Sequence, residues 1–270
     1  MHDHILKSAT KLWYDRDADH AAATVSYYSI FAIAPLVFLT LTVMSFIYDR
    51  ESVITFLNNI GAAMGTGSVS LVETATVNLS SIASNFWVPV LGAVFFSGMV
   101  VVFCNALTSG IHHVWGVPHA GFKGWVKKCR NAVTFIVAFE LYLIAVFALQ
   151  LTLRALTNGP TTIAWLIDQV FFVLATTVLF AIAFHILPWT STRLQSRLIG
   201  GFVASVLLVL VKVAVGWYLT ISPFPGLFEV AGALIVILMW IYSAASVFYF
   251  GAAVTHVVEG EYNKHHAKTV

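Results

Sequence analysis

Six long apolar runs, separated by shorter polar segments, dominate the hydrophobic pattern of the chain. Each run approaches or exceeds the roughly 20 residues that cross a bilayer core of about 30 Å, and none carries the polar stripe of a soluble amphipathic helix. Backbone inside hydrocarbon must satisfy its own hydrogen bonds, and the alternating ten-residue strands of a barrel are absent. The pattern predicts an all-α membrane protein, a six-transmembrane-helix bundle. The expected helices are 25–47, 87–107, 132–153, 170–187, 198–219 and 230–254.

The last two runs form the clearest structural unit. The short link 220–229 makes them antiparallel neighbours, a membrane hairpin. Pro223, Pro225 and Gly226 exclude regular helix from this link. Two readings of the link stay open: it caps the hairpin outside the membrane, or it enters the bundle as irregular backbone that lines an enclosed cavity.

Three polar segments complete the expected organisation around a transmembrane domain that spans 21–259. The N-terminal arm, 1–20, has helical spacing of apolar residues and predicts a short amphipathic helix on the inner membrane surface, with a disordered arm as the alternative. The first outer loop, 49–85, predicts two short amphipathic helices. Residues 260–270 form a cytoplasmic tail. The apolar face of the arm consists of Ile5, Ala9, Leu12 and Trp13, with Lys7 and Lys11 off it.

Composition agrees with a membrane protein. The chain is 59% hydrophobic and 10% charged, with a mean hydropathy of +0.88, which is too little charge to cover a soluble globule of 270 residues. The formal net charge of +2 is uninformative, and nothing in the sequence suggests a nucleic-acid surface. Cys104 and Cys129 flank an expected cytoplasmic loop, where thiols stay reduced, so no disulfide is expected.

The distribution of the 14 basic residues predicts the orientation. Eleven fall on one side of the membrane, Arg50 and Arg154 fall on the other, and Lys212 lies inside a run. The positive-inside rule therefore places both termini in the cytoplasm. The eleven are Lys7, Lys11, Arg16, Lys123, Lys127, Lys128, Arg130, Arg193, Arg197, Lys264 and Lys268.

Ionisable residues inside the apolar runs are the first candidates for a functional site, because charge in a bilayer is costly. Glu140 lies about 12 Å along the third helix from its cytoplasmic end, and Lys212 about 21 Å along the fifth. Lys212 can pair with Glu140 or with Glu229, at the mouth of the sixth helix. One reading is a buried ion pair or a lysine that snorkels to the headgroups. The other is a polar cavity in which Lys212 contacts an anionic substrate or a proton path.

Pro35 in the first run removes an amide hydrogen that would bond to the carbonyl of Phe31, which predicts a kink. A static kink and a moving hinge are both compatible with the sequence.

Metal and enzyme signatures are weak. Asp15, Asp17 and Asp19 suggest a calcium loop, but the sixth and twelfth positions are His20 and Ser26 rather than Gly and an acid, so these acids are interpreted as favourable charges at a helix start. There is no P-loop, HExxH or GxSxG motif, and no enzyme activity, metal or cofactor is expected. The histidines show no metal-ligand spacing; they include His112, His113, His119, His265 and His266.

Four sequence blocks resemble the YihY/BrkB family of bacterial inner-membrane proteins. They are AAATVSYYSIFAIAPL, NALTSGIHHVWGV, ILP at 186–188, and LVLVKVAVGWYLTISPFPGLFEVAGALIVILMWIYSAASVFYFGA. The resemblance covers about 21–259 and implies six helices and a cytoplasmic-membrane location. Two positions depart from the family pattern: Gly251, Ala252 and Ala253 lack the acid of Gly-Ala-Glu, and Phe228-Glu229 replaces Tyr-Gly.

An old label connects this family with ribonuclease BN. Nuclease chemistry needs clustered metal-binding acids or a general base, and the chain offers neither beyond the acids near its first helix. The leading hypothesis is therefore transporter-like handling of a small or amphiphilic anion, with Lys212 as the anion contact and Pro35 as a bend. The alternative is a non-catalytic envelope protein whose outer loop binds partners or lipids. Membrane lipids are expected partners; the substrate, coupling ion and oligomeric state are not specified by the sequence.

Overall fold

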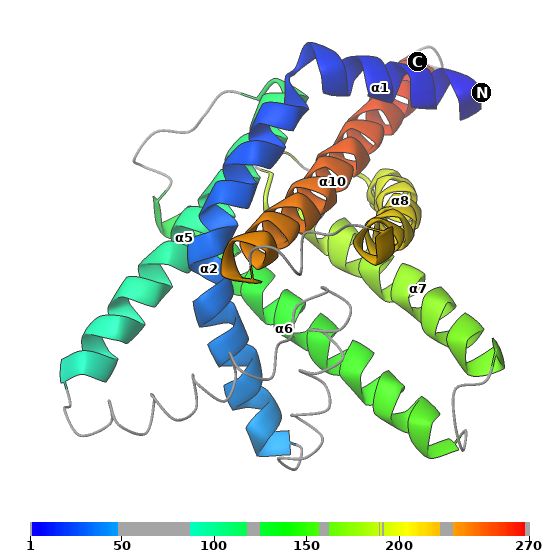
Figure 1. Cartoon of the computed structure of the whole chain (residues 1–270). Helices are drawn as coiled ribbons and strands as arrows, with labels where there is room; N and C mark the ends of the chain where they lie inside the picture. Colours follow the sequence, from blue (N-terminus) through cyan, green and yellow to red (C-terminus); the bar gives the residue numbers. More distant parts are fainter. Residues whose placement is uncertain are drawn as a thin grey trace. The chain divides into compact units, whose positions relative to one another are not determined.

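The computed structural model describes residues 2–47, 87–117, 125–156, 162–188, 190, 192–221 and 229–267. Across these residues the regular secondary structure is helical and contains no strand (Figure 1). The all-α prediction is confirmed at this level. The helices are α1 (His2–Asp15), α2 (Ala18–Ile47), α5 (Trp87–Trp115), α6 (Trp125–Leu156), α7 (Thr162–Ile186), α8 (Leu194–Ile221) and α10 (Glu229–Ala267).

Each apolar run predicted from the sequence lies almost wholly within one helix, from α2 to α10. Within the described residues, four helical segments are long and apolar enough to cross a membrane by length and composition. The other two runs lie in α2 and α5, so the number of six spans stays a prediction. The four segments are Cys129–Leu153, Leu166–Ile186, Leu194–Tyr218 and Ile235–Lys264.

Other predictions meet the described residues only in part. α1 confirms a helix in the N-terminal arm, and α10 continues to Ala267, through most of the expected tail. Pro35 lies inside the uninterrupted helix α2. The outer loop 49–85 and most of the link 220–229 lie outside the described residues.

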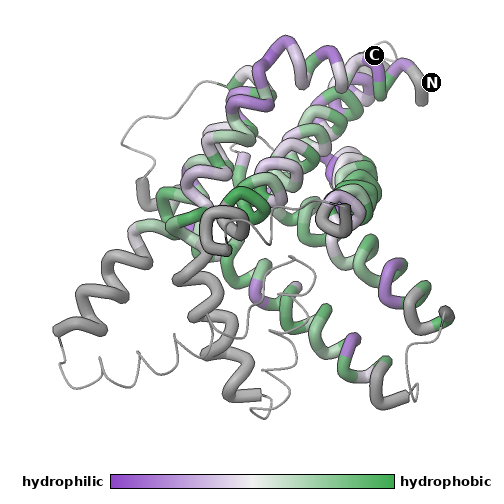
Figure 2. Tube along the Cα trace, viewed as in Figure 1, coloured by the Kyte–Doolittle hydropathy of each residue, from purple (hydrophilic) through white to green (hydrophobic). Residues whose placement is uncertain are grey.

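The outer faces of the apolar helices are hydrophobic, the reverse of a soluble protein. α6 exposes Val133, Val137 and Leu141 at a spacing of four residues, which is one stripe along a helix. Figure 2 shows the same contrast: hydrophilic residues are frequent in α1, whereas α6, α7 and α8 are mainly hydrophobic. Apolar surface of this extent is typical of helices that lie in a membrane. The equivalent stripes are Val170, Leu174 and Val178 on α7, and Leu198, Phe202, Val206 and Leu210 on α8.

The chain divides into two compact units, which are described separately. Unit 1 comprises Met1–Val25, Cys104–Val211 and Tyr242–Val270, and unit 2 comprises Ser26–Phe103 and Lys212–Ile241. All of α1, α6 and α7 belong to unit 1, together with one end each of α2, α5, α8 and α10.

Contacts within unit 1 bring the starts of α2, α6 and α8 to the same end as the ends of α5, α7 and α10. The side chain of Arg16, just before α2, lies against Gly116, just after α5. Trp115 at the end of α5 donates from Nε1 to the carbonyl of Ala252 in α10 at 2.9 Å. We call this region the basic end of unit 1, because Arg16, Arg130, Arg193 and Arg197 lie near it. Two further contacts at this end join Arg193 to Glu259 and Asn131 to the carbonyl of Ile186.

Glycines allow the helices of unit 1 to touch at backbone distance. A Cβ atom on Gly200 of α8 would collide with Thr255 and lie 2.5 Å from the carbonyl oxygen of Gly251, both in α10. A Cβ atom on Gly201, the next residue, would lie 2.8 Å from the carbonyl oxygen of Thr177 in α7. Adjacent glycines thus pack α8 against two neighbours at once, as small-residue motifs do in membranes.

The ends of α5 and α1 are built by residues in the left-handed backbone region. Gly116 has φ of +67°, and Val117 N donates to His112 O at 2.9 Å while Gly116 N donates to His113 O at 3.2 Å. This is a Schellman cap, which glycine adopts without strain. Asp17 has φ of 42° and ends α1. The aspartate is tolerated there because Asp visits this conformation more readily than most residues.

Candidate functional site

Polar side chains from three helices of unit 1 form hydrogen bonds between the helices. Tyr142 Oη of α6 and Thr176 Oγ1 of α7 are 3.0 Å apart, and Thr177 Oγ1 and Ser205 Oγ of α8 are 2.8 Å apart. Thr176, Thr177 and Ser205 are buried. Such bonds hold helices together in lipid, where a polar group has no water as an alternative partner.

Glu140 lies at a similar depth. Its residue is 6% exposed, so a carboxylic acid sits in the interior of unit 1. Two other polar atoms, Asn105 Oδ1 of α5 and Ser246 Oγ of α10, are buried and form no hydrogen bond in the part of the chain that the structure describes. Most buried polar atoms in proteins form a hydrogen bond with protein or with ordered water, so these positions are of interest for a site.

These residues share one level within unit 1. Counted along each helix from the residue that makes a contact at the basic end, they lie about 14 to 20 Å inward at a rise of 1.5 Å per residue. The residues from which the count starts are Trp115, Asn131, Ile186, Arg193 and Glu259. That depth is close to the middle of a hydrocarbon core of about 30 Å. We call this set the interior polar layer; its members are Asn105, Glu140, Tyr142, Thr176, Thr177, Ser205 and Ser246.

The other candidate residues from the sequence lie elsewhere. Lys212 is half-buried in α8 and belongs to unit 2, whereas Glu140 belongs to unit 1. Glu229 is the first residue of α10, and its side chain lies outside the described ones, as does that of Pro35. The pairing of Lys212 with Glu140 or Glu229 and the kink at Pro35 therefore stay predictions.

The basic end contains a second polar cluster, at the start of α8. Glu259 of α10 accepts hydrogen bonds from Arg193 N at 2.9 Å and from Ser196 Oγ at 2.7 Å, and its other oxygen lies 3.8 Å from Arg193 Nε. Ser196 is completely buried. The Arg193 side chain has no acceptor for the free amides at the start of α8. Glu259 of α10 instead accepts a hydrogen bond from one of them, the amide of Arg193 itself, and so caps this helix start from another helix.

Sequence reasoning missed the role of Glu259. Its partners lie 63 and 66 positions earlier in the chain, and no local capping motif relates them. One signal was present: Arg193, the residue before α8, has a side chain that cannot cap a helix start, and acids follow the last apolar run at positions 259 and 261.

Two of the blocks that carry the family resemblance meet at the interface of α5 and α10. Trp115 bonds to the carbonyl of Ala252 and stacks on His256, with ring centroids 5.7 Å apart. Tyr249 is fully buried and its hydroxyl lies 3.4 Å from the carbonyls of Ala106 and Leu107. A Cβ atom on Gly110 would collide with the Tyr249 ring, so glycine is required there.

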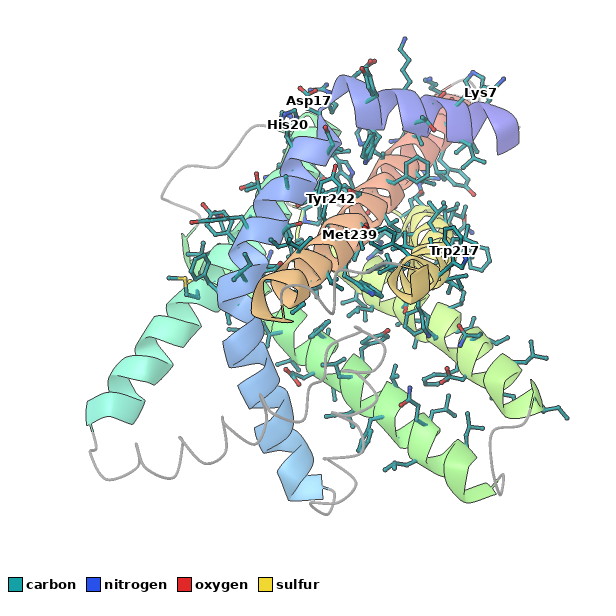
Figure 3. The ribbon with its side chains drawn as sticks, in the orientation of Figure 1. Lys7, Asp17, His20, Trp217, Met239 and Tyr242 are labelled. Atoms are coloured by element: carbon teal, nitrogen blue, oxygen red, sulfur yellow. The ribbon has the colours of Figure 1, made fainter. Side chains whose placement is uncertain are left out.

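The acids before α2 form a small exposed group. Ligand atoms of Asp17, Asp19 and His20 lie within 4.8 Å of one another, and Figure 3 shows Asp17 and His20 together at the turn between α1 and α2. Asp19 lies in the first turn of α2, as predicted for an acid at the positive helix end. The backbone turn at Asp17 accounts for that residue.

The described residues thus define an all-helical integral membrane protein with apolar outer faces, an interior polar layer and a basic end. The profile of the family described as "Virulence factor BrkB" matches residues 10–269, and the chain belongs to this family. The resemblance found in the sequence is confirmed.

Two curated relatives illustrate the distance within the family. A UPF0761 membrane protein of Coxiella burnetii (strain Dugway 5J108-111) is 26% identical over 270 residues, which cover 91% of this chain and 90% of the relative. A UPF0761 membrane protein of Yersinia pestis (strain Pestoides F) is 25% identical over 193 residues, 63% of each chain. No solved structure matches the chain.

Proposed function

We propose that this BrkB-family protein is a six-span, transporter-like protein of the bacterial inner membrane that handles a small or amphiphilic anion. The interior polar layer carries the proposal. Five helices each contribute polar side chains at one depth, and one of those side chains is the buried carboxyl group of Glu140. Ionisable and polar groups are costly at that depth, and in membrane proteins they mark substrate or proton pathways.

The direction of the helices supports the six-span topology. At the basic end, starts and ends alternate in chain order from α2 to α10, which is the arrangement of a chain that crosses back and forth. Arg16, Arg130, Arg193 and Arg197 lie near this end, so the positive-inside rule assigns it to the cytoplasm.

We expect both termini on the cytoplasmic side. A fluorescent protein fused after Val270 should fluoresce, and alkaline phosphatase fused there should be inactive, because it folds only after export. The same two reporters inserted in 49–85 should give the opposite pattern. Termini on opposite faces of the membrane would contradict the six-span count.

Two ionisable residues have different proposed roles. Lys212, half-buried in α8, provides the positive charge that attracts the anion. Glu140 provides a protonatable group in the interior polar layer. A cation and a carboxylic acid on different helices are suited to a carrier in which anion and proton move together.

A deletion strain tests the proposal. We expect accumulated metabolites or envelope lipids to change on deletion, wild type to restore them, and Lys212→Met and Glu140→Gln to fail although both accumulate in the membrane. Lys264→Met is the matched control, because Lys264 is exposed and pairs with Glu261 of its own helix at 3.5 Å. Full complementation by Lys212→Met would reject the anion role. If complementation instead depended on 49–85, the envelope-protein alternative would replace the transporter proposal.

A further inference from the structure

The first turns of α8 combine two arginines with lipid-exposed leucines. Arg193 and Arg197 are four residues apart, so they lie on the same side of the helix. Leu194 and Leu198 are each one position further on and are 59% and 38% exposed. A row of positive charge therefore runs beside a row of apolar surface where α8 begins.

Each arginine side chain makes a contact that restricts it. Arg197 folds back so that its Nε lies 3.4 Å from the carbonyl oxygen of Arg193. The Arg193 guanidinium lies over the ring of Tyr262 in α10, 5.5 Å from the ring centroid. This cation–π contact restricts the arginine without neutralising its charge.

Glu259 does not satisfy this charge. It faces Arg193 through Nε at 3.8 Å, whereas a guanidinium carries five N–H donors, and the Arg193 side chain remains 42% exposed. Two arginines against one carboxylate leave a local excess of one positive charge. Glu259 also occupies the backbone amide of Arg193, so the arginine side chains, and not the helix terminus, are the groups available to another anion.

We propose that the start of α8 is a binding site for an anionic phospholipid. Arginine binds phosphate oxygens in bidentate geometry, and Tyr262 adds an aromatic ring of the kind found at headgroup level. Leu194 and Leu198 lie where the acyl chains of that lipid begin. Charge and apolar surface match a phospholipid with a free negative charge better than a neutral zwitterionic one.

This site is independent of the proposed transport activity. It requires only that α8 crosses the membrane with Arg193 and Arg197 at the headgroup level. If the lipid-binding test fails, the anion-transporter proposal is unaffected. If the transporter proposal fails, the lipid-binding proposal is likewise unaffected.

The test measures lipid retention by the full chain. The purified protein is exchanged into phosphatidylcholine nanodiscs with or without phosphatidylglycerol, and bound lipid is counted by native mass spectrometry after release. We expect wild type to retain phosphatidylglycerol over phosphatidylcholine. Arg197→Gln should weaken that preference about fivefold, because one basic residue near an anionic membrane surface changes the binding affinity by about that factor. Arg197→Gln is the decisive variant because it leaves the pair of Arg193 with Glu259 intact.

Controls separate lipid recognition from other causes. Arg130→Gln removes an exposed arginine near the start of α6 and should leave the preference unchanged. Equal loss in Arg130→Gln, or none in Arg197→Gln, would overturn the proposal. Inorganic phosphate at millimolar concentration should not displace the lipid; if it does, the site recognises a free anion and the lipid assignment is wrong.

Discussion

Replacing Gly200 by valine should unfold or mispack unit 1, and more severely than Gly200→Ala or Gly216→Ala. At this position a Cβ atom would meet the side chain of Thr255 and the carbonyl oxygen of Gly251, 2.5 Å away. Thr255 is itself tied to α10, because its hydroxyl donates to the Gly251 carbonyl at 2.9 Å. The Gly251 carbonyl is backbone, and the Thr255 hydroxyl is held by its hydrogen bond to that carbonyl. Neither can move aside easily, so α8 and α10 have to separate.

The expected cost is about 3 kcal/mol or more, at the upper end of what overpacking causes in protein interiors. The measurement is thermal unfolding of the detergent-purified protein, followed by intrinsic fluorescence and by the monodisperse fraction on size exclusion. Gly200→Ala should show the same defect to a smaller degree, since its single methyl group already enters the contact.

Gly216→Ala is the matched control on the same helix. No described atom lies within 4 Å of a Cβ atom there, so alanine should be neutral or slightly stabilising, because it has the higher helix propensity. An unchanged melting temperature in Gly200→Val would show that α8 and α10 are not packed at backbone distance.

The sequence predicted the helices well, because the apolar runs are long and the spacing in the N-terminal arm is regular. It was less informative about where α10 ends. Hydropathy falls after residue 254, yet Thr255 and Val258 are buried and the helix continues to Ala267. Tertiary packing on one face, rather than overall apolarity, extends the helix beyond the run.

Contacts between distant parts of the chain could not be predicted. Glu140 was identified because a lone acid in an apolar run is conspicuous, and its burial agrees with that reasoning. The pairs Thr177–Ser205 and Trp115–Ala252 depend on which helices are neighbours, and side-chain periodicity does not contain this information. The face of α1 that was expected to lie on the membrane includes Ala9, which is fully buried by protein.

Replacing Glu259 by alanine should produce the second large effect, because one carboxylate serves several groups at the start of α8. Without it the hydroxyl of Ser196, completely buried, loses its acceptor, at a cost of about 1–3 kcal/mol. Loss of the helix cap adds about 1 kcal/mol. The ion pair itself adds little, since the Arg193 side chain is 42% exposed and exposed pairs contribute at most about 1 kcal/mol.

The total expected loss is about 2–4 kcal/mol, measured as a lower midpoint of thermal unfolding in detergent. Glu261→Ala is the control: the residue is two positions away on the same helix and pairs with exposed Lys264 at 3.5 Å, so its removal should change stability by less than about 0.5 kcal/mol.

A double-mutant cycle identifies the mechanism. If the buried hydroxyl is the main source of the loss, Ser196→Ala combined with Glu259→Ala should be less destabilising than the sum of the single changes, because the first removes the group that the second leaves unsatisfied. Strict additivity would mean that Glu259 acts through the helix cap and Arg193 alone. In either case the first turn of α8 depends for part of its stability on Glu259 of α10, the same residue whose carboxylate lies 3.8 Å from Arg193 Nε.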